Sequence, residues 1–335
     1  MNYTEERDVS AVYKQNYIDG IKAVIDRRQK EAEQKRDEYI KDILTDADRY
    51  REDLAEMLGW PLVNHDDKEP PICTAHKLSD EDGYSIYRLE FEILDGVKMT
   101  GLFFKADSTE KRPLVIVQHG GLGTPELISG VYGNTSNYND MLMRVRNHGV
   151  HVFAPQVLLW SEDYNVEFDR KEIDASLKRV GSSITAIEVH GIRRILDYFE
   201  TQEYVSCFGM VGMSYGGFYT LYTTALEKRI KAALSCSFFN SRDAVHWTDW
   251  VWHNSGYCFD DAEVACLAYP RKLCLMMGDS DNLFKSEYSE KSFERIKKIC
   301  KKVGTDWTKL IIFEGTHEFC KDDEPIAEII KELEK

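Results

Sequence analysis

The stretch that decides the fold is Cys207-Phe208-Gly209-Met210-Val211-Gly212-Met213-Ser214-Tyr215-Gly216-Gly217. Its apolar first half predicts a buried strand, and residues 218–226 that follow predict a helix. Ser214 stands at the corner between them, in a Gly-x-Ser-x-Gly pattern that is typical of a nucleophile elbow. The glycines two before and two after it would let neighbouring backbone come close. The same pattern arises by chance in Gly/Ser loops, but the strand before it and the helix after it favour a catalytic serine.

Strands and helices alternate through most of the chain. Residues 84–94 and 97–105 alternate apolar and polar side chains around Asp95-Gly96, which predicts an antiparallel hairpin. This start, followed by strand–helix alternation, predicts an α/β fold with a mixed, mostly parallel sheet and helices on both faces. The later strands are predicted at 113–118, 150–155, 208–213, 230–238, 272–278 and 310–314, and the helices at 139–147, 182–200, 217–228, 286–302 and 325–333.

A glycine-rich turn, Gln118-His119-Gly120-Gly121-Leu122-Gly123, follows the first strand after the hairpin. At the carboxyl end of a parallel sheet its backbone N–H groups can point at a developing oxyanion, and Gly121 or Gly120 would supply one donor. The N–H of Tyr215, next to the serine, would supply the other. A dinucleotide site is the alternative. We reject it because the third glycine of that fingerprint is missing and Thr124-Pro125-Glu126 stands in its place.

An acid and a base follow later strands. The turn Gly278-Asp279-Ser280-Asp281 offers two carboxylates, and His317 comes just after the last predicted strand. The order serine, aspartate, histidine is the one that the α/β-hydrolase topology imposes. We therefore expect Ser214, one of the two aspartates and His317 to form a catalytic triad. Among the other histidines, His119 is expected to shape its turn, and His246 and His253 are the remaining candidates for a role at the site.

Taken together, these features resemble an α/β-hydrolase, in the branch of the acetyl xylan esterases and dienelactone hydrolases. The resemblance covers residues 84–335 and rests on the hairpin, the His-Gly-Gly turn, the Gly-x-Ser-x-Gly-Gly elbow and the terminal histidine, in that order. Tyr269-Pro270-Arg271-Lys272-Leu273 also resembles the Ala-Pro-Arg-Pro-Leu motif of that branch. The resemblance implies an esterase that needs no metal or cofactor.

The resemblance also bears on the choice of the acid. In those relatives the acid stands three residues after the strand-ending glycine, which here is Gly278. This implies Asp281 as the triad acid and leaves Asp279 as a loop residue, although aspartate is also a common turn residue.

Two stretches matter for the substrate. Residues 156–160 stand where many relatives carry an Arg-Gly-rich turn, so no substrate contact is transferred from that turn. The segment 239–262 is rich in bulky aromatic side chains, and we expect it to build a pocket wall or small cap from Trp247, Trp250, Trp252 and His253. Exposed indole faces suit sugar rings and would favour a carbohydrate ester, whereas simple burial of the indoles is the alternative.

Residues 1–62 are expected to form a helical extension ahead of a catalytic domain at 63–335. From Val12 to Trp60 the sequence is dense in charge, with apolar residues at helical spacing, and Gly59-Trp60-Pro61 ends the last helix. This predicts two or three amphipathic helices. Their sparse apolar faces should lie on the main domain or on a second subunit, so a homo-oligomer through the N-terminal helices is compatible with the sequence.

Charge and cysteine content exclude several classes of protein. With 43 basic against 58 acidic residues the formal net charge is −15, which argues against nucleic acid and anionic membranes as partners. No apolar run is long enough to span a bilayer, and the first residues lack the profile of a signal peptide. The eight cysteines are scattered without metal-ligand spacing, and several lie in apolar runs. We expect a cytoplasmic protein without disulfides.

A small-molecule or oligosaccharide ester is therefore the expected substrate, and three other functions stay open. A prolyl-oligopeptidase-like peptidase fits the elbow and the order of the triad, but the large N-terminal propeller of that group is absent. A lactone hydrolase also fits, although dienelactone hydrolases proper carry a cysteine where Ser214 stands. A non-catalytic hydrolase fold that serves in binding is the third, although such proteins usually lose a triad member.

Overall fold

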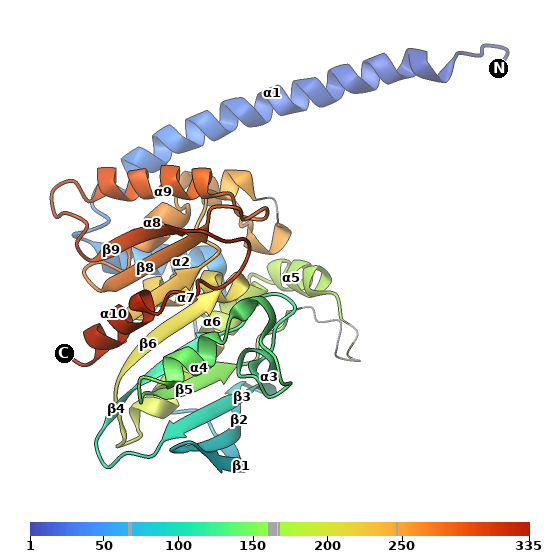
Figure 1. Ribbon diagram of the computed structural model, residues 1–335. Helices are drawn as coiled ribbons and strands as arrows, with labels where there is room; N and C mark the ends of the chain where they lie inside the picture. Colours follow the sequence, from blue (N-terminus) through green and yellow to red (C-terminus); the bar gives the residue numbers. More distant parts are fainter. Residues whose placement is uncertain (66–68, 160–165, 167, 246) are drawn as a thin grey trace.

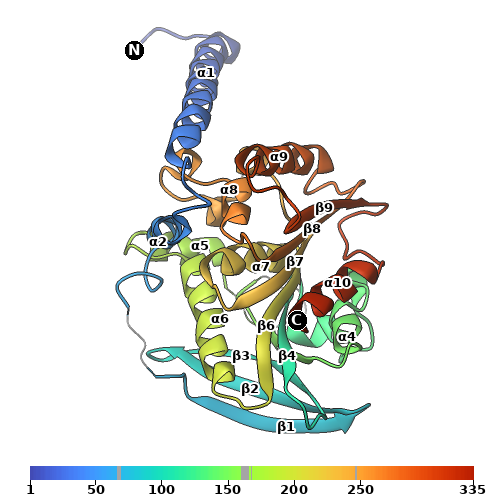
Figure 2. The same ribbon diagram turned by 90° about the vertical axis from the view of Figure 1, so that its left-hand side faces the viewer.

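A twisted sheet forms the centre of the molecule, as the computed structural model of residues 1–65, 69–159, 166, 168–245 and 247–335 shows (Figures 1 and 2). In these residues the sheet has nine strands in the order β1-β2-β3-β5-β4-β6-β7-β8-β9. β1, β2, β3 and β5 pair antiparallel, and β5, β4, β6, β7, β8 and β9 pair parallel, which confirms the predicted mixed sheet. The strands are β1 (Cys73–Glu81), β2 (Tyr84–Leu94), β3 (Val97–Ala106), β4 (Arg112–Gln118), β5 (His151–Pro155), β6 (Val205–Met213), β7 (Ile230–Cys236), β8 (Lys272–Gly278) and β9 (Thr308–Phe313).

The predicted hairpin is formed by β2 and β3. Leu94 pairs with Val97 across the Asp95-Gly96 turn, where Gly96 has a φ of 75° that suits glycine. Because β3 also pairs antiparallel with β5, the hairpin joins the outer antiparallel strands to the parallel part of the sheet. The turn end of the hairpin therefore lies at the edge where the parallel strands end.

Helices cover both faces of the sheet, as predicted. One face carries α6 (Ile184–Glu200) and α7 (Tyr215–Leu226), and the other carries α4 (Met141–Arg146) and α10 (Glu324–Leu333) (Figure 2). Successive residues of a strand point to opposite faces, so Ile116 joins the first core and Val117 the second. The remaining α-helices are α1 (Arg7–Tyr39), α2 (Ala47–Leu58), α3 (Pro125–Ile128), α5 (Arg170–Lys178), α8 (Asp261–Cys266) and α9 (Ser286–Ile299).

Two helices, α1 and α2, occupy the N-terminal extension, and they relate differently to the rest of the molecule. α2 buries Tyr50, Leu54 and Leu58 in the same core as α6 and α7. α1 buries Ala32 and Arg36 near its C-terminal end, while residues 1–28 are exposed. Figures 1 and 2 show this helix projecting away from the sheet. α2 and the C-terminal end of α1 are therefore buried by packing on the rest of the chain. Most of α1 has no such partner in the described chain.

Candidate active site

Ser214 lies at the sharp turn between β6 and α7. Its backbone has φ 58° and ψ −123°, which is a strained conformation for a residue with a side chain. Glycines make this turn sterically feasible, because a Cβ on Gly212 would lie 2.2 Å from the Gly216 carbonyl oxygen and one on Gly216 would lie 2.0 Å from that of Gln118. The sequence pattern predicted this close approach. The turn places the serine at the carboxyl edge of the parallel strands, as in a nucleophile elbow.

His317 and Asp281 come together at the same edge. His317 follows β9, and its Nδ1 lies 2.8 Å from Oδ2 of Asp281, which follows β8. The second carboxylate oxygen of Asp281 accepts hydrogen bonds from the backbone N–H groups of Leu283 at 2.8 Å and Phe284 at 3.0 Å. Because three donors surround the carboxylate, it is held in one orientation and can fix the tautomer of the imidazole.

Asp279 has a different role in the same loop. Its Oδ1 accepts hydrogen bonds from the Gly315 N–H at 3.2 Å and from the Ser280 hydroxyl at 3.0 Å. The bond from Gly315 ties the loop after β8 to the loop after β9, and the bond from Ser280 lies within the first loop. Of the two carboxylates considered from the sequence, the structure thus brings Asp281 to the histidine.

The loop that carries His317 is anchored near the serine by hydrogen bonds on both sides. The Ser214 N–H donates to the Cys236 carbonyl at 2.9 Å, and the hydroxyl of the next residue, Ser237, donates to the Glu318 carbonyl at 2.9 Å. From the other side, the Asn137 amide donates to the His317 carbonyl at 2.9 Å. Among the described residues no hydrogen bond within 3.5 Å joins Ser214 Oγ to His317, and such contacts are often long before substrate binds.

The glycine-rich turn after β4 lies directly against the serine. A Cβ on Gly120 would lie 2.8 Å from the Ser214 Cβ. The Gly120 N–H, however, donates to the Tyr138 hydroxyl at 2.9 Å, which weighs against Gly120 as an oxyanion donor. Gly121 is the other expected donor in this turn, and Tyr215 begins α7, where backbone N–H groups point out of the helix end.

His119 shapes this turn from inside the protein. Its Nδ1 lies 2.9 Å from the Gly120 carbonyl oxygen, and its Nε2 accepts from the Val157 N–H at 3.2 Å. Burial lowers the pKa of His119 to about 4. The ring is therefore neutral at neutral pH, with the proton on Nδ1, and it links the turn after β4 to the loop after β5.

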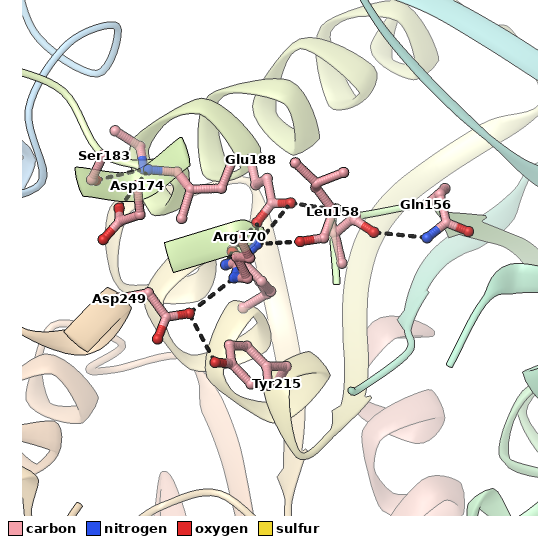
Figure 3. A network of polar contacts seen from close by, with 12 residues as sticks. Gln156, Leu158, Arg170, Asp174, Ser183, Glu188, Tyr215 and Asp249 are labelled. Carbon is pink, nitrogen blue, oxygen red and sulfur yellow. Dashed lines mark hydrogen bonds and ion pairs between the residues drawn. The ribbon is translucent and has the colours of Figure 1, made fainter. Parts of the chain in front are cut away.

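A buried network of charges supports the residue next to the serine (Figure 3). The Tyr215 hydroxyl donates to Asp249 at 2.8 Å, and the same carboxylate oxygen accepts from the Arg170 guanidinium at 2.9 Å. Arg170 also contacts Glu188 at 3.2 Å. Burial opposes the charge on Arg170, but the two carboxylates outweigh burial and raise the pKa of the guanidinium. Arg170 therefore keeps its charge, and the carboxylate that it binds, Asp249, fixes the Tyr215 ring.

The aromatic segment corrects part of the pocket prediction. Trp250 and Trp252 are buried, with exposed fractions of 1% and 6%, and they pack on Phe218 of α7, so the alternative of simple burial holds for both. Trp247 is partly exposed and stacks on Tyr215 with ring centroids 5.4 Å apart. His253 is exposed, and His246 lies outside the described residues.

The ring of Phe284 connects Trp247 to the histidine. Its centroid lies 5.8 Å from that of Trp247 and 5.6 Å from that of His317. Trp250 makes ring contacts with Tyr215 and Phe284 as well, at 4.4 and 6.0 Å, but it is buried, so Trp247 is the partly exposed indole of this cluster. Sequence reasoning missed Phe284, and its place directly after the acid loop was the available signal.

Comparison with known proteins identifies the family of the chain. The sequence profile of the dienelactone hydrolase family matches residues 101–332. The chain belongs to the dienelactone hydrolase family. Dienelactones are cyclic carboxylic esters, so this dienelactone hydrolase relative is a carboxylic ester hydrolase of the α/β-hydrolase superfamily, as the sequence predicted. No curated protein matches the chain in sequence.

Solved structures of esterases share the fold of this family member at low sequence identity. A putative acetyl xylan esterase from Bacteroides fragilis is 17% identical over 79% of this chain and 74% of its own, with a TM-score of 0.66. A glucuronoyl esterase from Solibacter usitatus is 13% identical over 88% of this chain and 93% of its own, with a TM-score of 0.65. Acetyl xylan esterase 1 from Thermoanaerobacterium is 16% identical over 87% of this chain and 94% of its own, with a TM-score of 0.57. These likenesses confirm the α/β-hydrolase fold.

Two further properties bear on cofactors and membranes. Among the described residues, no group of three or more His, Cys, Asp or Glu side chains is placed to hold a metal ion. No helix in the described part of the chain is both long and apolar enough to span a membrane.

Proposed function

We propose that this dienelactone hydrolase relative cleaves carboxylic esters through an acyl-enzyme, with Ser214, Asp281 and His317 as the catalytic triad. The observation that carries the proposal is the 2.8 Å contact between His317 Nδ1 and Asp281, at the sheet edge where the strained turn presents Ser214. A carboxylate in this place keeps Nε2 of the imidazole unprotonated and able to accept the proton of the serine.

The reaction then proceeds in two halves. His317 takes the proton from Ser214 as its oxygen attacks the ester carbonyl, and the resulting imidazolium is stabilised by Asp281. His317 next protonates the leaving alcohol, which departs and leaves the acyl group on the serine. Water attacks that acyl group in the same manner, with His317 as the base, and releases the acid.

The oxyanion of each tetrahedral intermediate would be bound by two backbone N–H groups, those of Tyr215 and Gly121. The engagement of the Gly120 N–H with Tyr138 favours Gly121 over Gly120 in this role. The buried bond from Tyr215 to Asp249 fixes the first donor, because it prevents the helix start from shifting. Each such donor typically contributes about 10²–10³-fold to the rate.

We propose a carbohydrate ester with a small acyl group, such as acetyl, as one substrate class. The names of the structural neighbours favour it, and the partly exposed Trp247 ring near the histidine offers an apolar face of the kind on which a sugar can stack. A lactone is the second candidate, because the family is named for the hydrolysis of lactones.

The proposed ester hydrolysis predicts both turnover and covalent labelling. The purified chain is expected to hydrolyse p-nitrophenyl acetate and to take up one equivalent of a fluorophosphonate probe, because only an activated serine is phosphonylated. Mass spectrometry of the digested protein should place the label on Ser214. Heat-unfolded protein is the control and should stay unlabelled. Labelling of a different residue, or a folded protein that neither turns over the ester nor reacts, would contradict the assignment.

We also propose that two copies of the chain pair through α1. The exposed part of this helix carries an apolar stripe at helical spacing, formed by Val9, Tyr13, Tyr17, Ile21, Val24 and Ile25. Antiparallel pairing would place the acidic start of one helix, Glu5, Glu6 and Asp8, beside the basic stretch Arg27, Arg28 and Lys30 of the other. A second copy therefore offers both the apolar surface and the complementary charge.

Light scattering coupled to size exclusion tests the pairing. Wild type is expected to elute as a dimer, and Ile21→Glu as a monomer, because the carboxylate would be buried in the apolar stripe. The control is Gln15→Glu, which adds the same charge on the opposite face of the helix and should leave the dimer intact. Wild type that stays monomeric at high micromolar concentration would refute this pairing.

The cytoplasm is the proposed compartment. All eight cysteines are free, and six of them are buried in the fold. Buried thiols suit a reducing compartment.

A further inference from the structure

A cavity of about 460 Å³ with mostly apolar walls lies where β5 ends and β3 begins. Four segments far apart in the sequence line it: the turn end of the hairpin, the loop after β5, the start of α6, and Thr124 after the glycine-rich turn. Their apolar contributions include Ile93, Val97 and Met99 from the first, Val157 and Leu159 from the second, and Ile187 from the third.

The topology places this cavity at the same sheet edge as the serine. β3 runs antiparallel to β5, so its first residues lie where β5 ends, and the Gln156 N–H donates to the Thr100 carbonyl at 2.7 Å. β5, β4 and β6 are consecutive neighbours in the sheet. The loop after β5 is therefore two strand spacings, roughly 10 Å, from the turn that carries Ser214.

The cavity wall is continuous with the turn that would bind the oxyanion. Val157 lines the cavity, and its N–H is bonded to His119 at 3.2 Å, immediately before Gly120. Thr124 lines the cavity too and directly follows the glycine-rich turn. A group attached to an ester carbonyl that is held at this turn can therefore extend into the cavity.

Four polar side chains of the wall, those of Lys98, Thr124, Gln156 and Glu188, are engaged with the protein itself, and Gln156 Nε2 donates to the Val157 carbonyl at 2.7 Å. Lys98 Nζ lies 2.7 Å from Glu90, and the Thr124 hydroxyl oxygen accepts from the Leu127 N–H at 3.2 Å. Glu188 accepts from the Leu158 N–H at 2.5 Å and is paired with Arg170 (Figure 3). A sugar in this cavity would lose its hydrogen bonds to water without gaining adequate replacements, whereas a hydrocarbon would lose none.

We propose that this cavity receives an apolar group of the ester substrate that is larger than acetyl. Its volume lies within the range of small-molecule sites, and its lining matches theirs, with apolar walls and few polar groups. The proposal rests on ester hydrolysis at Ser214, and it adds that one side of the ester, acyl or alcohol, is a hydrocarbon chain or ring, which favours a lactone or an ester with a longer acyl group over an acetylated sugar.

Two series of esters distinguish the two sides. p-Nitrophenyl esters from acetate to octanoate lengthen the acyl group, and acetates from ethyl to octyl lengthen the alcohol. In the series whose variable group enters the cavity, kcat/KM is expected to rise by up to about fourfold for each added methylene until the cavity is full. A rise in the first series assigns the cavity to the acyl group, and a rise in the second assigns it to the alcohol.

A bulky substitution at the wall tests the place of binding. Val97→Trp should cut kcat/KM for the longest good substrate at least tenfold and leave p-nitrophenyl acetate within about twofold, because the indole would fill the cavity without reaching the serine. Val303→Trp is the matched control. Val303 is 44% exposed against 41% for Val97 and lies outside the cavity lining, so this variant should behave as wild type with both esters.

The outcomes separate this inference from the proposed function. Folded wild type that leaves every ester intact would overturn the proposed function itself. Wild type that hydrolyses acetate esters but shows no gain in either series would overturn the cavity assignment alone. An equal loss of rate for short and long esters in Val97→Trp would also overturn the cavity assignment alone.

Discussion

Ser214→Ala is expected to lower kcat/KM for p-nitrophenyl acetate by about 10⁵-fold or more, because the variant lacks the oxygen that would attack the ester. The fold should persist. Among the described residues the Ser214 hydroxyl makes no hydrogen bond within 3.5 Å, and alanine keeps the Cβ that the turn already accommodates. Stopped-time assays at high enzyme concentration measure the residual rate, and circular dichroism and thermal unfolding verify the fold.

Ser280→Ala is a suitable control for the loss at Ser214. Ser280 is an exposed serine in the loop of the acid, and its hydroxyl bonds to Asp279. Its removal should change kcat/KM by less than about threefold. If Ser214→Ala retained activity near that of wild type, another residue would have to be the nucleophile.

Asp281→Asn is expected to lower kcat by about 10⁴-fold, because the amide can donate to Nδ1 and hold the imidazole in the wrong tautomer. Asp281 is 4% exposed, and its second oxygen receives two backbone N–H groups, so the asparagine side chain cannot turn away into solvent. The residual activity should be measured over a range of pH with p-nitrophenyl acetate, beside the wild type.

Asp279→Asn provides the comparison within the same loop. It changes the same functional group two residues away, but its contacts are with Gly315 and Ser280 and not with the imidazole. A loss of less than about tenfold is expected, from the looser loop. A larger loss at Asp279 than at Asp281 would transfer the role of the acid to Asp279.

The regular elements could be predicted where side-chain burial is periodic. The hairpin strands were predicted to within one residue of their observed ends, because one face of each is buried and the turn residues mark their limits. β1 was not predicted, because it lies at the edge of the sheet with mostly exposed side chains and carries little hydrophobic pattern. α5 was missed because its nine residues are mainly polar and its two buried side chains, Arg170 and Asp174, are charged.

The candidate site was predictable where each residue stands directly after a strand. Ser214, Asp281 and His317 all do, so topology alone brings them to one edge. The network of Arg170, Glu188 and Asp249 was not predictable. Its members come from α5, α6 and the 3₁₀ turn Thr248–Trp250, and no local pattern distinguishes a buried charge pair from two surface charges. Whether Trp250 and Trp252 are buried in the core or line a pocket was not predictable either, since an indole suits both places.

The strained turn at Ser214 also bears on how the chain folds. Its geometry is maintained from outside, by the Gln118 carbonyl that abuts Gly216 and by the Cys236 carbonyl that receives the Ser214 N–H. These partners lie on β4 and β7, so the turn is held only after strands separated by many residues have met. A nascent or partly unfolded chain would relax the turn and lose the reactive geometry. Hydrolytic competence therefore requires that β4, β6 and β7 have paired, so an incompletely folded chain is expected to be inactive.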